Sequence, residues 1–391
     1  MNEMFNPTND LRSLLDWWSN HMFDRDAGGC YGSCNNDNVV NKLADRSAVM
    51  NTRVLWTFSA AARTLSDDKY ASAAKHVYTY LNSKFLDNVN GGYYWLINAA
   101  GEVVDNKKQI YAQAFGLYAL SEYYRIQPDE SIRSEALKIF DLIEQYGRDK
   151  TLEGYIEAFS GNWESLEDLR LSAKDLNAEK TMNTHLHVLE AYTNLYRIAP
   201  LPKVKEALRS LIQLFLSNFI DPTTFHLHLF FDREWNNLAS IDSYGHDIEC
   251  SWLLVEAAEV LGDDSLLQSV KKAAVKMADI TLQEGTDEDS AIFNEKDQDH
   301  LDADKHWWPQ AEAVVGFFNA YQLSGNAKFL DAAKETYNFI QDTLYTGDGE
   351  WFWKTTKDGV VQKHEDKAGP WKAPYHNGRM YLELLHRKAK L

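Results

Sequence analysis

Amphipathic helices recur along the chain at nearly regular intervals, each one after a short polar loop. In the segment that follows Gly262, the apolar residues Val270, Ala274 and Met277 fall on one helical face, while neighbouring lysines face away. Similar segments begin at residues 66, 127, 199, 262 and 324, which are 61 to 72 residues apart. A helix over residues 9–22 has the same character. We expect these six segments to be outer helices with one face in water.

A second set of helices, poorer in charge, alternates with the first. Small residues are frequent in them, such as Ala112, Ala114, Gly116 and Ala119 in one segment. A helix that is apolar on all sides typically packs against other elements on both of its faces. Their expected ranges are 46–64, 108–125, 181–198, 246–261, 307–323 and 373–388. Six inner and six outer helices predict an all-α fold, an (α/α)6 barrel, formed by a single domain over residues 1–391. An open solenoid is the alternative, but neither end of the chain carries a polar capping repeat.

Loops rich in glycine, aromatic and acidic residues connect the outer helices to the inner ones. Residues 91–104 and 349–361 alternate in polarity around a glycine turn, so both predict short β-hairpins. In a closed barrel all such loops lie at one end, together with the N-termini of the inner helices. Residues near those N-termini should converge on the axis, where the positive ends of the helix dipoles gather. They are Arg53, Tyr111, His187, His246, Trp308 and His376.

The composition narrows the classes of partner. The net charge is −18 over 391 residues. Nucleic acids and anionic membranes call for basic surfaces, so we expect neither as a partner. No apolar run approaches the ~20 residues that span a bilayer, and the first residues lack the basic and apolar segments of a signal peptide. The cysteines, Cys30, Cys34 and Cys250, are odd in number, which favours a reducing compartment and a cytoplasmic protein.

The stretch from Ile241 to Trp252 carries the first sign of chemistry. Gly245 ends a loop and His246 is expected to open a helix, with Glu249 three residues later on the same face. A carboxylate beside an imidazole can fix its tautomer and shift its pKa. The 12 tryptophans and 20 tyrosines supply flat rings of the kind that pack on sugar faces. A histidine that merely caps a helix is the alternative explanation of this stretch.

Four further stretches repeat this mixture of histidine, aromatic and charged residues. They are Asn51–Arg53, Met182–Tyr192, His306–Glu312 and Trp371–Arg379. Together with the stretch around His246 and the paired helices, they resemble the N-acylglucosamine 2-epimerase superfamily, over essentially the whole chain. The last two stretches are most similar to its cellobiose 2-epimerase branch.

The resemblance implies an (α/α)6 barrel and an isomerase. The implied activity inverts C2 of the reducing-end sugar in β-1,4-linked disaccharides such as cellobiose and lactose. Catalytic roles are implied for His246, His376, His187 and Arg53. Substrate contacts are implied for Tyr111, Asn183, Glu249, Trp308 and Trp371. Glu312, one turn after Trp308, is placed with this second set, with a purely structural ion pair as its alternative.

The implied reaction explains why such residues are needed. Opening the sugar ring requires one proton given and one taken, and a proton must then leave C2, next to the aldehyde carbon. Inversion through a cis-enediol calls for two groups of near-neutral pKa on opposite faces of C2, a task that suits histidines better than ordinary carboxylates. Arg53 and His187 would stabilise the developing oxyanion. Neither redox chemistry nor phosphate is involved, so we expect no cofactor and no metal. We also expect a monomer that binds a small disaccharide.

Alternative functions stay open at this point. An N-acylglucosamine 2-epimerase or a mannose-type aldose–ketose isomerase would use the same scaffold and histidines. An inverting glycoside hydrolase needs two carboxyls roughly 6.5–9.5 Å apart. Asp247, Glu249 and Glu312 would be its carboxyls, but hydrolysis does not explain the histidines. A non-catalytic sugar-binding protein and a divalent ion held by the histidines with Glu249 are further alternatives.

Four other histidines are expected to have no part in the chemistry. His185 lies one step off the face of His187 and should be structural. His226, His228 and His300 are in loops and should be solvated.

Overall fold

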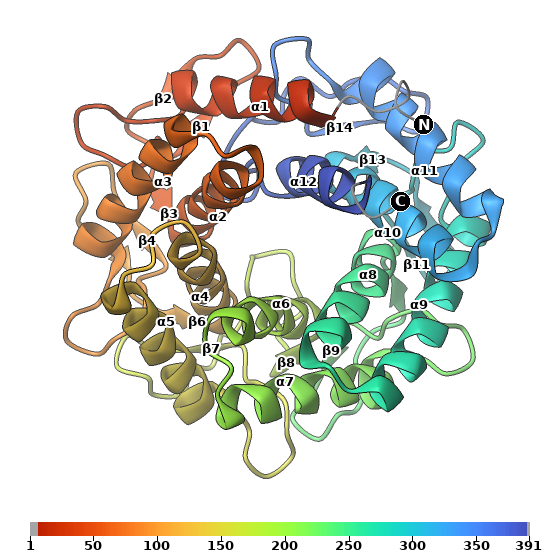
Figure 1. The fold of residues 1–391 in the computed structure, drawn as a ribbon, viewed down its shortest axis with the longest axis horizontal. Coiled ribbons are helices and arrows are strands. Elements are labelled where there is room, and N and C mark those ends of the chain that lie inside the picture. The colour runs from red at the N-terminus through yellow and green to blue at the C-terminus, as the bar shows by residue number, and fades with distance from the viewer. Residues whose placement is uncertain (1–6, 389–391) are drawn as a thin grey trace.

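The helices form two concentric rings (Figure 1). The computed structural model describes residues 7–388 of the chain. The inner ring comprises α2 (Ala48–Leu65), α4 (Ile110–Tyr124), α6 (Met182–Ile198), α8 (Tyr244–Leu261), α10 (Trp307–Ser324) and α12 (His376–Lys388). The outer ring comprises α1 (Pro7–His21), α3 (Asp68–Tyr80), α5 (Glu130–Leu142), α7 (Pro202–Leu214), α9 (Asp264–Glu284) and α11 (Ala327–Phe339). The first outer helix, α1, packs against the last inner helix, α12, which closes the ring.

Burial explains the division between the two rings. Helix α4 is buried along its whole length from Ile110 to Tyr123, because it packs against α2, α5 and α6. Helix α7 buries a stripe that includes Val204, Leu208 and Leu211 and leaves its other faces to water. The period of the hydrophobic positions therefore decides which ring a helix joins. The predicted (α/α)6 barrel is confirmed.

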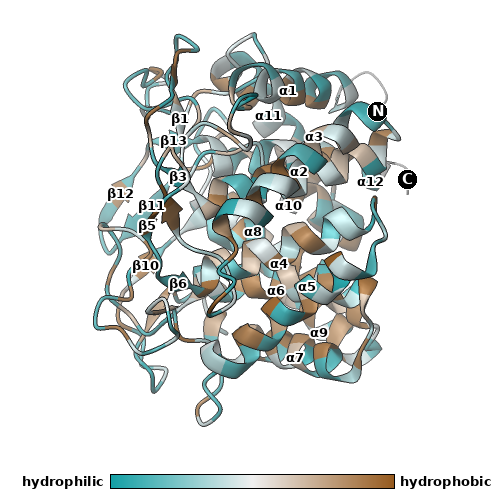
Figure 2. Cartoon of the chain, turned by 90° about the vertical axis from the view of Figure 1, so that its left-hand side faces the viewer, coloured by the Kyte–Doolittle hydropathy of each residue, from teal (hydrophilic) through white to brown (hydrophobic). Residues whose placement is uncertain are grey.

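Short strands gather at one end of the barrel, beside the helices in the view of Figure 2. They are β1 (Ser33–Cys34), β2 (Val40–Asn41), β3 (Arg46–Ser47), β4 (Leu96–Ile97), β5 (Val103–Asp105), β6 (Lys108–Gln109), β7 (Ala158–Phe159), β8 (Lys180–Thr181), β9 (Phe230–Phe231), β10 (Ile241–Asp242), β11 (Glu295–Asp297), β12 (His300–Asp302), β13 (Lys305–His306) and β14 (Lys354–Thr355). The sheets are β1–β2, β3–β4–β5, β6–β7, β8–β9, β10–β11–β12 and β13–β14, and their strands pair antiparallel. Strands β3, β6, β8 and β13 run directly into inner helices, so each of their four sheets links one helix N-terminus to a loop of the next repeat.

A hydrogen bond between a loop and an inner helix recurs around the ring. In five repeats a side chain of the inner helix accepts a hydrogen bond from a backbone N–H of the preceding loop. The pairs are Cys30 N to Asn51 Oδ1 (3.2 Å), Tyr93 N to Gln113 Oε1 (2.7 Å), Tyr155 N to His185 Nε2 (2.8 Å), Leu227 N to Asp247 Oδ1 (2.9 Å) and Ile292 N to Gln310 Oε1 (2.7 Å). We refer to these bonds as the loop ties. They anchor the loops to the helical turns that carry the residues expected to converge.

Some boundaries differ from the sequence prediction. Helix α8 begins at Tyr244, before His246, because the Ser243 carbonyl already accepts a helical bond from Asp247 N. The hairpin predicted over residues 91–104 is confirmed by β4 and β5. The hairpin predicted over 349–361 is reduced to a bridge between Thr355 and Val361, while β14 also pairs with β13 on its other edge. Four outer helices end in π-helical turns that the sequence did not predict: Leu81–Phe85, Ile143–Gly147, Phe215–Phe219 and Ile340–Leu344.

Within residues 7–388, none of the helices combines the length and the apolar character that crossing a membrane requires. The first six residues, on which the expected lack of a signal peptide depends, lie outside the described residues. The single domain over residues 1–391 stays a prediction.

Candidate active site

A cavity of about 320 Å³ lies at the N-terminal ends of the inner helices. Its lining includes the six residues expected to converge: Arg53, Tyr111, His187, His246, Trp308 and His376. Asn183, Glu249 and Trp371 line it as well. A wider groove of about 1020 Å³ adjoins this cavity and shares Asn183, His246 and Trp308 with it. Nine of the ten predicted site residues thus meet in one cavity, and Glu312 lies behind it.

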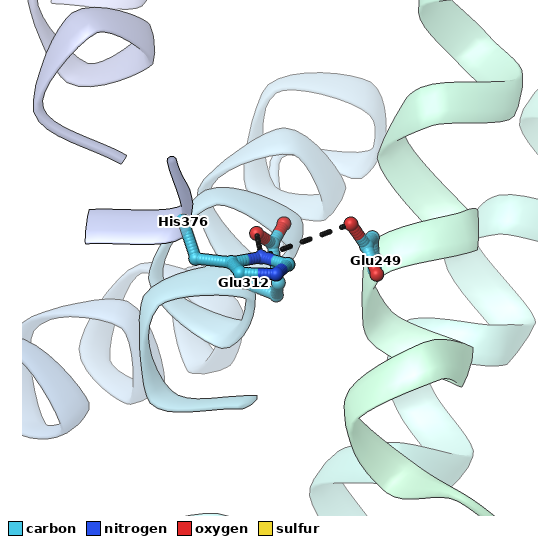
Figure 3. Close-up of side chains that lie close together, drawn as sticks. All are labelled: Glu249, Glu312 and His376. Atoms are coloured by element: carbon cyan, nitrogen blue, oxygen red, sulfur yellow. Dashed lines mark hydrogen bonds and ion pairs between the residues drawn. The ribbon is translucent and has the colours of Figure 1, made fainter. Parts of the chain in front are cut away.

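Glu312 holds the imidazole of His376 from behind (Figure 3). Its Oε1 lies 2.7 Å from His376 Nδ1, whereas Oε1 of Glu249 lies 3.9 Å from the same nitrogen. Glu312 is buried, and Trp252 Nε1 donates to its other oxygen at 3.0 Å. With Nδ1 occupied, Nε2 is the nitrogen of His376 that is left for the cavity. Glu312 therefore orients a histidine, which differs from the substrate contact expected of it.

Arg379, one helical turn after His376, lies among three buried carboxylates. It donates from Nη2 to Glu249 and to Glu312, and from Nη1 to Glu190. Burial raises the pKa of Glu249 to about 7, and the charge of Glu312 adds to this effect. Ligand atoms of Glu249, Glu312 and His376 lie within 4.8 Å of one another. The guanidinium already supplies the positive charge between these carboxylates, so the cluster does not fit a metal ion.

A second carboxylate–imidazole pair lies on α6. Nδ1 of His187 is 3.1 Å from Oε2 of Glu190, one turn further along the helix. The hydroxyl of Tyr375 donates to the same carboxylate at 2.5 and 2.6 Å. Burial alone would raise the pKa of Glu190, but Arg379 and His187 outweigh it and lower this pKa to about 2. Because Arg379 binds both Glu190 and Glu312, it connects the two pairs.

His246 has a neutral partner instead. Its Nδ1 lies 2.7 Å from Ser243 Oγ, and burial lowers its pKa to about 3. The predicted pairing of His246 with Glu249 is wrong, because the carboxylate of Glu249 turns to Arg379 and towards His376. Burial and the nearby arginines lower the pKa of His376 well below its ordinary value. Both imidazoles are therefore neutral near pH 7 and able to accept a proton.

The indole of Trp308 contacts both of these histidines. Its ring centroid lies 4.7 Å from that of His246 and 5.6 Å from that of His376. Gly245 makes room for this ring, since a Cβ atom at that position would lie 2.5 Å from the indole. The position of the Trp308 indole therefore depends on the absence of a side chain at residue 245.

Arg53 supplies a fixed positive charge to the cavity. It donates from Nη2 to the Tyr111 hydroxyl at 2.6 Å and from Nη1 to the Trp371 carbonyl at 3.1 Å. Its guanidinium also lies 4.4 Å from the ring centre of Phe115 and 4.9 Å from that of Tyr375. These contacts hold the side chain in one place, which suits a group that must stabilise a developing oxyanion.

Four residues of this network were missed by the sequence reasoning. They are Ser243, Glu190, Tyr375 and Arg379. A signal existed for Glu190, which follows His187 at the same spacing as Glu249 follows His246. Tyr375 and Arg379 lie inside the stretch 371–379, but nothing local shows that they meet Glu190.

The four histidines that were expected to have no part in the chemistry divide into two groups. His185 is structural, as predicted, since its Nδ1 lies 2.6 Å from the Thr181 carbonyl and its Nε2 makes a loop tie. The prediction that His226 is solvated is wrong: it is 6% exposed, because its Nδ1 lies 2.7 Å from Oδ2 of the buried Asp247. His228 is partly exposed and His300 is exposed, as expected of loop residues.

The model of the N-acylglucosamine 2-epimerase family matches residues 29–378. The chain belongs to this family. A cellobiose 2-epimerase from Bacteroides fragilis is 44% identical over 376 residues, which are 95% of this chain and 95% of that one. The solved structure of the cellobiose 2-epimerase from Bacillus thermoamylovorans has a TM-score of 0.95 and 36% identity, over 99% of this chain and 100% of that one. The resemblance and the isomerase class predicted from the sequence are confirmed.

The alternative functions correspond to more distant proteins. The N-acylglucosamine 2-epimerase of Rattus norvegicus is 22% identical over 94% of this chain and 87% of its own. The structure of a D-mannose isomerase has a TM-score of 0.86 at 18% identity, and that of a family 76 α-mannanase from Bacteroides thetaiotaomicron has 0.69 at 14%. At these identities the two structures show a shared fold alone.

Proposed function

We propose that this protein epimerises C2 of the reducing-end sugar in β-1,4-linked disaccharides. Cellobiose would become 4-O-β-D-glucosyl-D-mannose, and lactose would become epilactose. The observation that carries the proposal is the presence of two neutral imidazoles, His246 and His376, in one cavity and against one indole. The high similarity to cellobiose 2-epimerases supports the disaccharide over the substrates of the more distant relatives.

The chemistry at C2 needs the two imidazoles in opposite protonation states, so one of the two neutral rings first takes up a proton from solvent. The neutral imidazole takes the C2 proton at Nε2, and the electrons of that bond form the C1–C2 double bond and an oxyanion at O1. The protonated imidazole then returns a proton to the other face of C2, and the double bond reverts to the aldehyde. The two protonation states are thereby exchanged, and solvent resets them. In the same scheme the imidazoles relay the proton from the anomeric hydroxyl to the ring oxygen during ring opening.

The other lining residues receive supporting roles in this proposal. Arg53 and His187 stabilise the oxyanion at O1, as fixed donors beside the reacting carbon. Contacts to the sugar units are assigned to Tyr111, Asn183, Trp308 and Trp371. Glu312 accepts from Nδ1 of His376 and in its ionised form stabilises the imidazolium, while Glu249, with a pKa of about 7, lies farther from this nitrogen at 3.9 Å.

The proposal includes a cytoplasmic monomer that works without a cofactor or a metal. The three cysteines, Cys30, Cys34 and Cys250, are buried free thiols, which fits a reducing compartment. Activity should persist after exhaustive chelation. A loss of activity that a divalent ion restores would contradict this part of the proposal.

Turnover in heavy water tests the reaction. Cellobiose, N-acetylmannosamine and mannose are incubated side by side, and both product and recovered substrate are examined by NMR. We expect glucosyl-mannose as the main product, with deuterium at C2 of the reducing-end unit. Turnover of the monosaccharides alone, or release of free glucose, would contradict the proposal.

Two variants test the assigned roles. His246→Ala and His376→Ala should each lower kcat by about 100-fold or more, because each removes one of the two proton-exchanging groups. His228→Ala, which changes a partly exposed histidine outside the cavity, is the control and should leave kcat unchanged. Product formation that survives His246→Ala would exclude this residue from the proton exchange.

A further inference from the structure

The fourth repeat, which carries His246, differs in charge from the others. In five repeats a buried basic residue shortly before the inner helix forms an ion pair with an acid of the preceding loop. The pairs are Arg46–Asp24 (2.6 Å), Lys108–Asp87 (2.8 Å), Lys180–Asp149 (3.4 Å), Lys305–Asp287 (2.9 Å) and Lys372–Glu350 (2.8 Å). In the fourth repeat the corresponding residue, directly before Ser243, is the acid Asp242. This repeat therefore lacks the basic residue that the other repeats have at this place.

Asp247 also departs from the pattern of the loop ties. The helix side chains that accept the equivalent bonds are uncharged in the other repeats: Asn51, Gln113, His185 and Gln310. Asp247 is a carboxyl with 0% exposure. Its Oδ1 accepts from Leu227 N at 2.9 Å, and its Oδ2 lies 2.7 Å from His226 Nδ1. A buried carboxyl–imidazole pair thus replaces the neutral tie of the other repeats.

His226 supplies the missing positive charge. Its Nε2 lies 3.5 Å from Oε2 of Glu284, at the end of α9, and the ring of Tyr244 is 6.0 Å away. Burial lowers the pKa of His226, but Asp247, Asp242 and Glu284 outweigh it and raise this pKa to about 9. His226 is therefore a cation at neutral pH, and it connects the loop to both α8 and α9.

Helix α8, like α4 and α10, has no side-chain cap, and its N-cap residue is engaged elsewhere. Ser47 caps α2 and Thr181 caps α6, since each side chain accepts a backbone N–H of the first turn. Ser243 is the N-cap residue of α8, but its side chain makes no capping bond. Its hydroxyl contacts Nδ1 of His246 instead. The turn that carries His246 is thus held through Asp247.

We infer that His226 and Asp247 are positioning residues for His246: their charged pair holds the first turn of α8 so that this imidazole faces the cavity. Neither residue lines that cavity, so they act through the helix and not on the substrate. The inference rests on the proposed function, in which His246 exchanges the C2 proton. A displacement of the turn by ~1 Å would be enough to lower the rate by about 100-fold.

Kinetics of matched variants test the inference. His226→Ala should lower kcat for cellobiose by about 10- to 100-fold, with KM changed less than about twofold because the sugar contacts remain. His226→Gln should recover part of the loss, since its amide can donate to Asp247. His228→Gln, in the same loop, is the control. An unchanged kcat in His226→Ala, or the same loss in the control, would overturn the inference.

The pH profile separates positioning from a general structural effect. Wild-type kcat should fall as pH rises through about 9, where the imidazolium of His226 is lost. This fall in kcat should be absent in His226→Gln, whose kcat should stay at one reduced level over the same pH range. Since the folded-state pKa is raised, stabilisation by this charge is complete below the ordinary pKa of ~6.5 and lost through about 9. If His226→Gln showed the same fall in kcat near pH 9 as the wild type, the positioning role of His226 and Asp247 would be contradicted.

A measurement without substrate distinguishes failure of this inference from failure of the proposed function. Histidine-selective ¹⁵N labelling resolves the ring nitrogens, with His246→Gln and His376→Gln used for assignment. In His226→Gln the signals of His246 should move while those of His376 stay. If this holds but the wild type does not epimerise cellobiose, the proposed function fails and the positioning pair stands. Unmoved His246 signals would overturn the pair even in an active enzyme.

Discussion

Oε1 of Glu312 lies 2.7 Å from Nδ1 of His376, so a buried carboxylate backs this imidazole. His246 is backed only by the hydroxyl of Ser243, also at 2.7 Å. The two histidines assigned to C2 are therefore unequal, because a carboxylate stabilises an imidazolium and a hydroxyl does so far less. Arg379 keeps the carboxylate in place by donating to its Oε1 at 2.6 Å.

Glu312→Gln removes the charge behind His376 and keeps the shape of the side chain. We expect kcat to fall by about 100-fold or more, with little change in KM, because the substituted residue lies behind the cavity. Initial rates with cellobiose measure this. Glu383→Gln, which changes an acid on α12 paired with Arg387, is the control and should behave as the wild type. An active Glu312→Gln enzyme would show that the carboxylate only fills space.

Ser243→Ala separates the role of a hydroxyl in orienting His246 from its role in capping a helix. Because this hydroxyl makes no capping bond, the free energy of unfolding should change by less than about 0.5 kcal/mol, while kcat falls about tenfold. Ser47→Ala, which removes the cap of α2, should show the reverse: about 1 kcal/mol of lost stability and a smaller change in kcat. Urea unfolding and initial rates on both variants provide the comparison. Equal losses of stability would contradict the assignment.

Arg379→Met leaves three buried carboxylates without their shared cation. Its Nη atoms bind Glu190, Glu249 and Glu312, and it is 1% exposed. Removing one partner of a buried ion pair costs about 3–5 kcal/mol. The free energy of unfolding, measured by urea denaturation, should fall by about this amount. Arg379→Lys keeps the charge but cannot reach all three acids, and should lose activity with a smaller loss of stability. Arg387→Lys, on the same helix, is the control.

Gly245→Ala places a methyl group where the indole of Trp308 now lies. The new Cβ would come within 2.5 Å of that ring, so the indole must move away from His246 and His376. We expect a higher KM and a lower kcat, with an (α/α)6 fold that is otherwise intact. Gly369→Ala is the matched control, because a Cβ there meets no atom within 4 Å. Wild-type kinetics in Gly245→Ala would mean that the position of Trp308 has no bearing on the reaction.

Local patterns were sufficient to predict the fold and the location of the cavity. The spacing of hydrophobic residues separated inner helices such as α4 from outer helices such as α7, because burial on all faces and burial on one face leave different periods in the sequence. Helix N-termini at one end of the ring then brought Arg53, His187 and His376 to one cavity. Within one helix, spacing also carries information, as Glu190 beside His187 shows.

Partners from different helices were decided only by the tertiary structure. Arg379 meets Glu190, 189 positions away, and Glu312, 67 positions away, and no local spacing encodes these contacts. For the same reason Glu249 turned to Arg379 instead of His246. His226 was expected to be solvated because it lies in a loop, yet it contacts Asp247 and is buried. A sequence sets which residues share a helical face, whereas the choice among several charged partners depends on distances that exist only after the ring has closed.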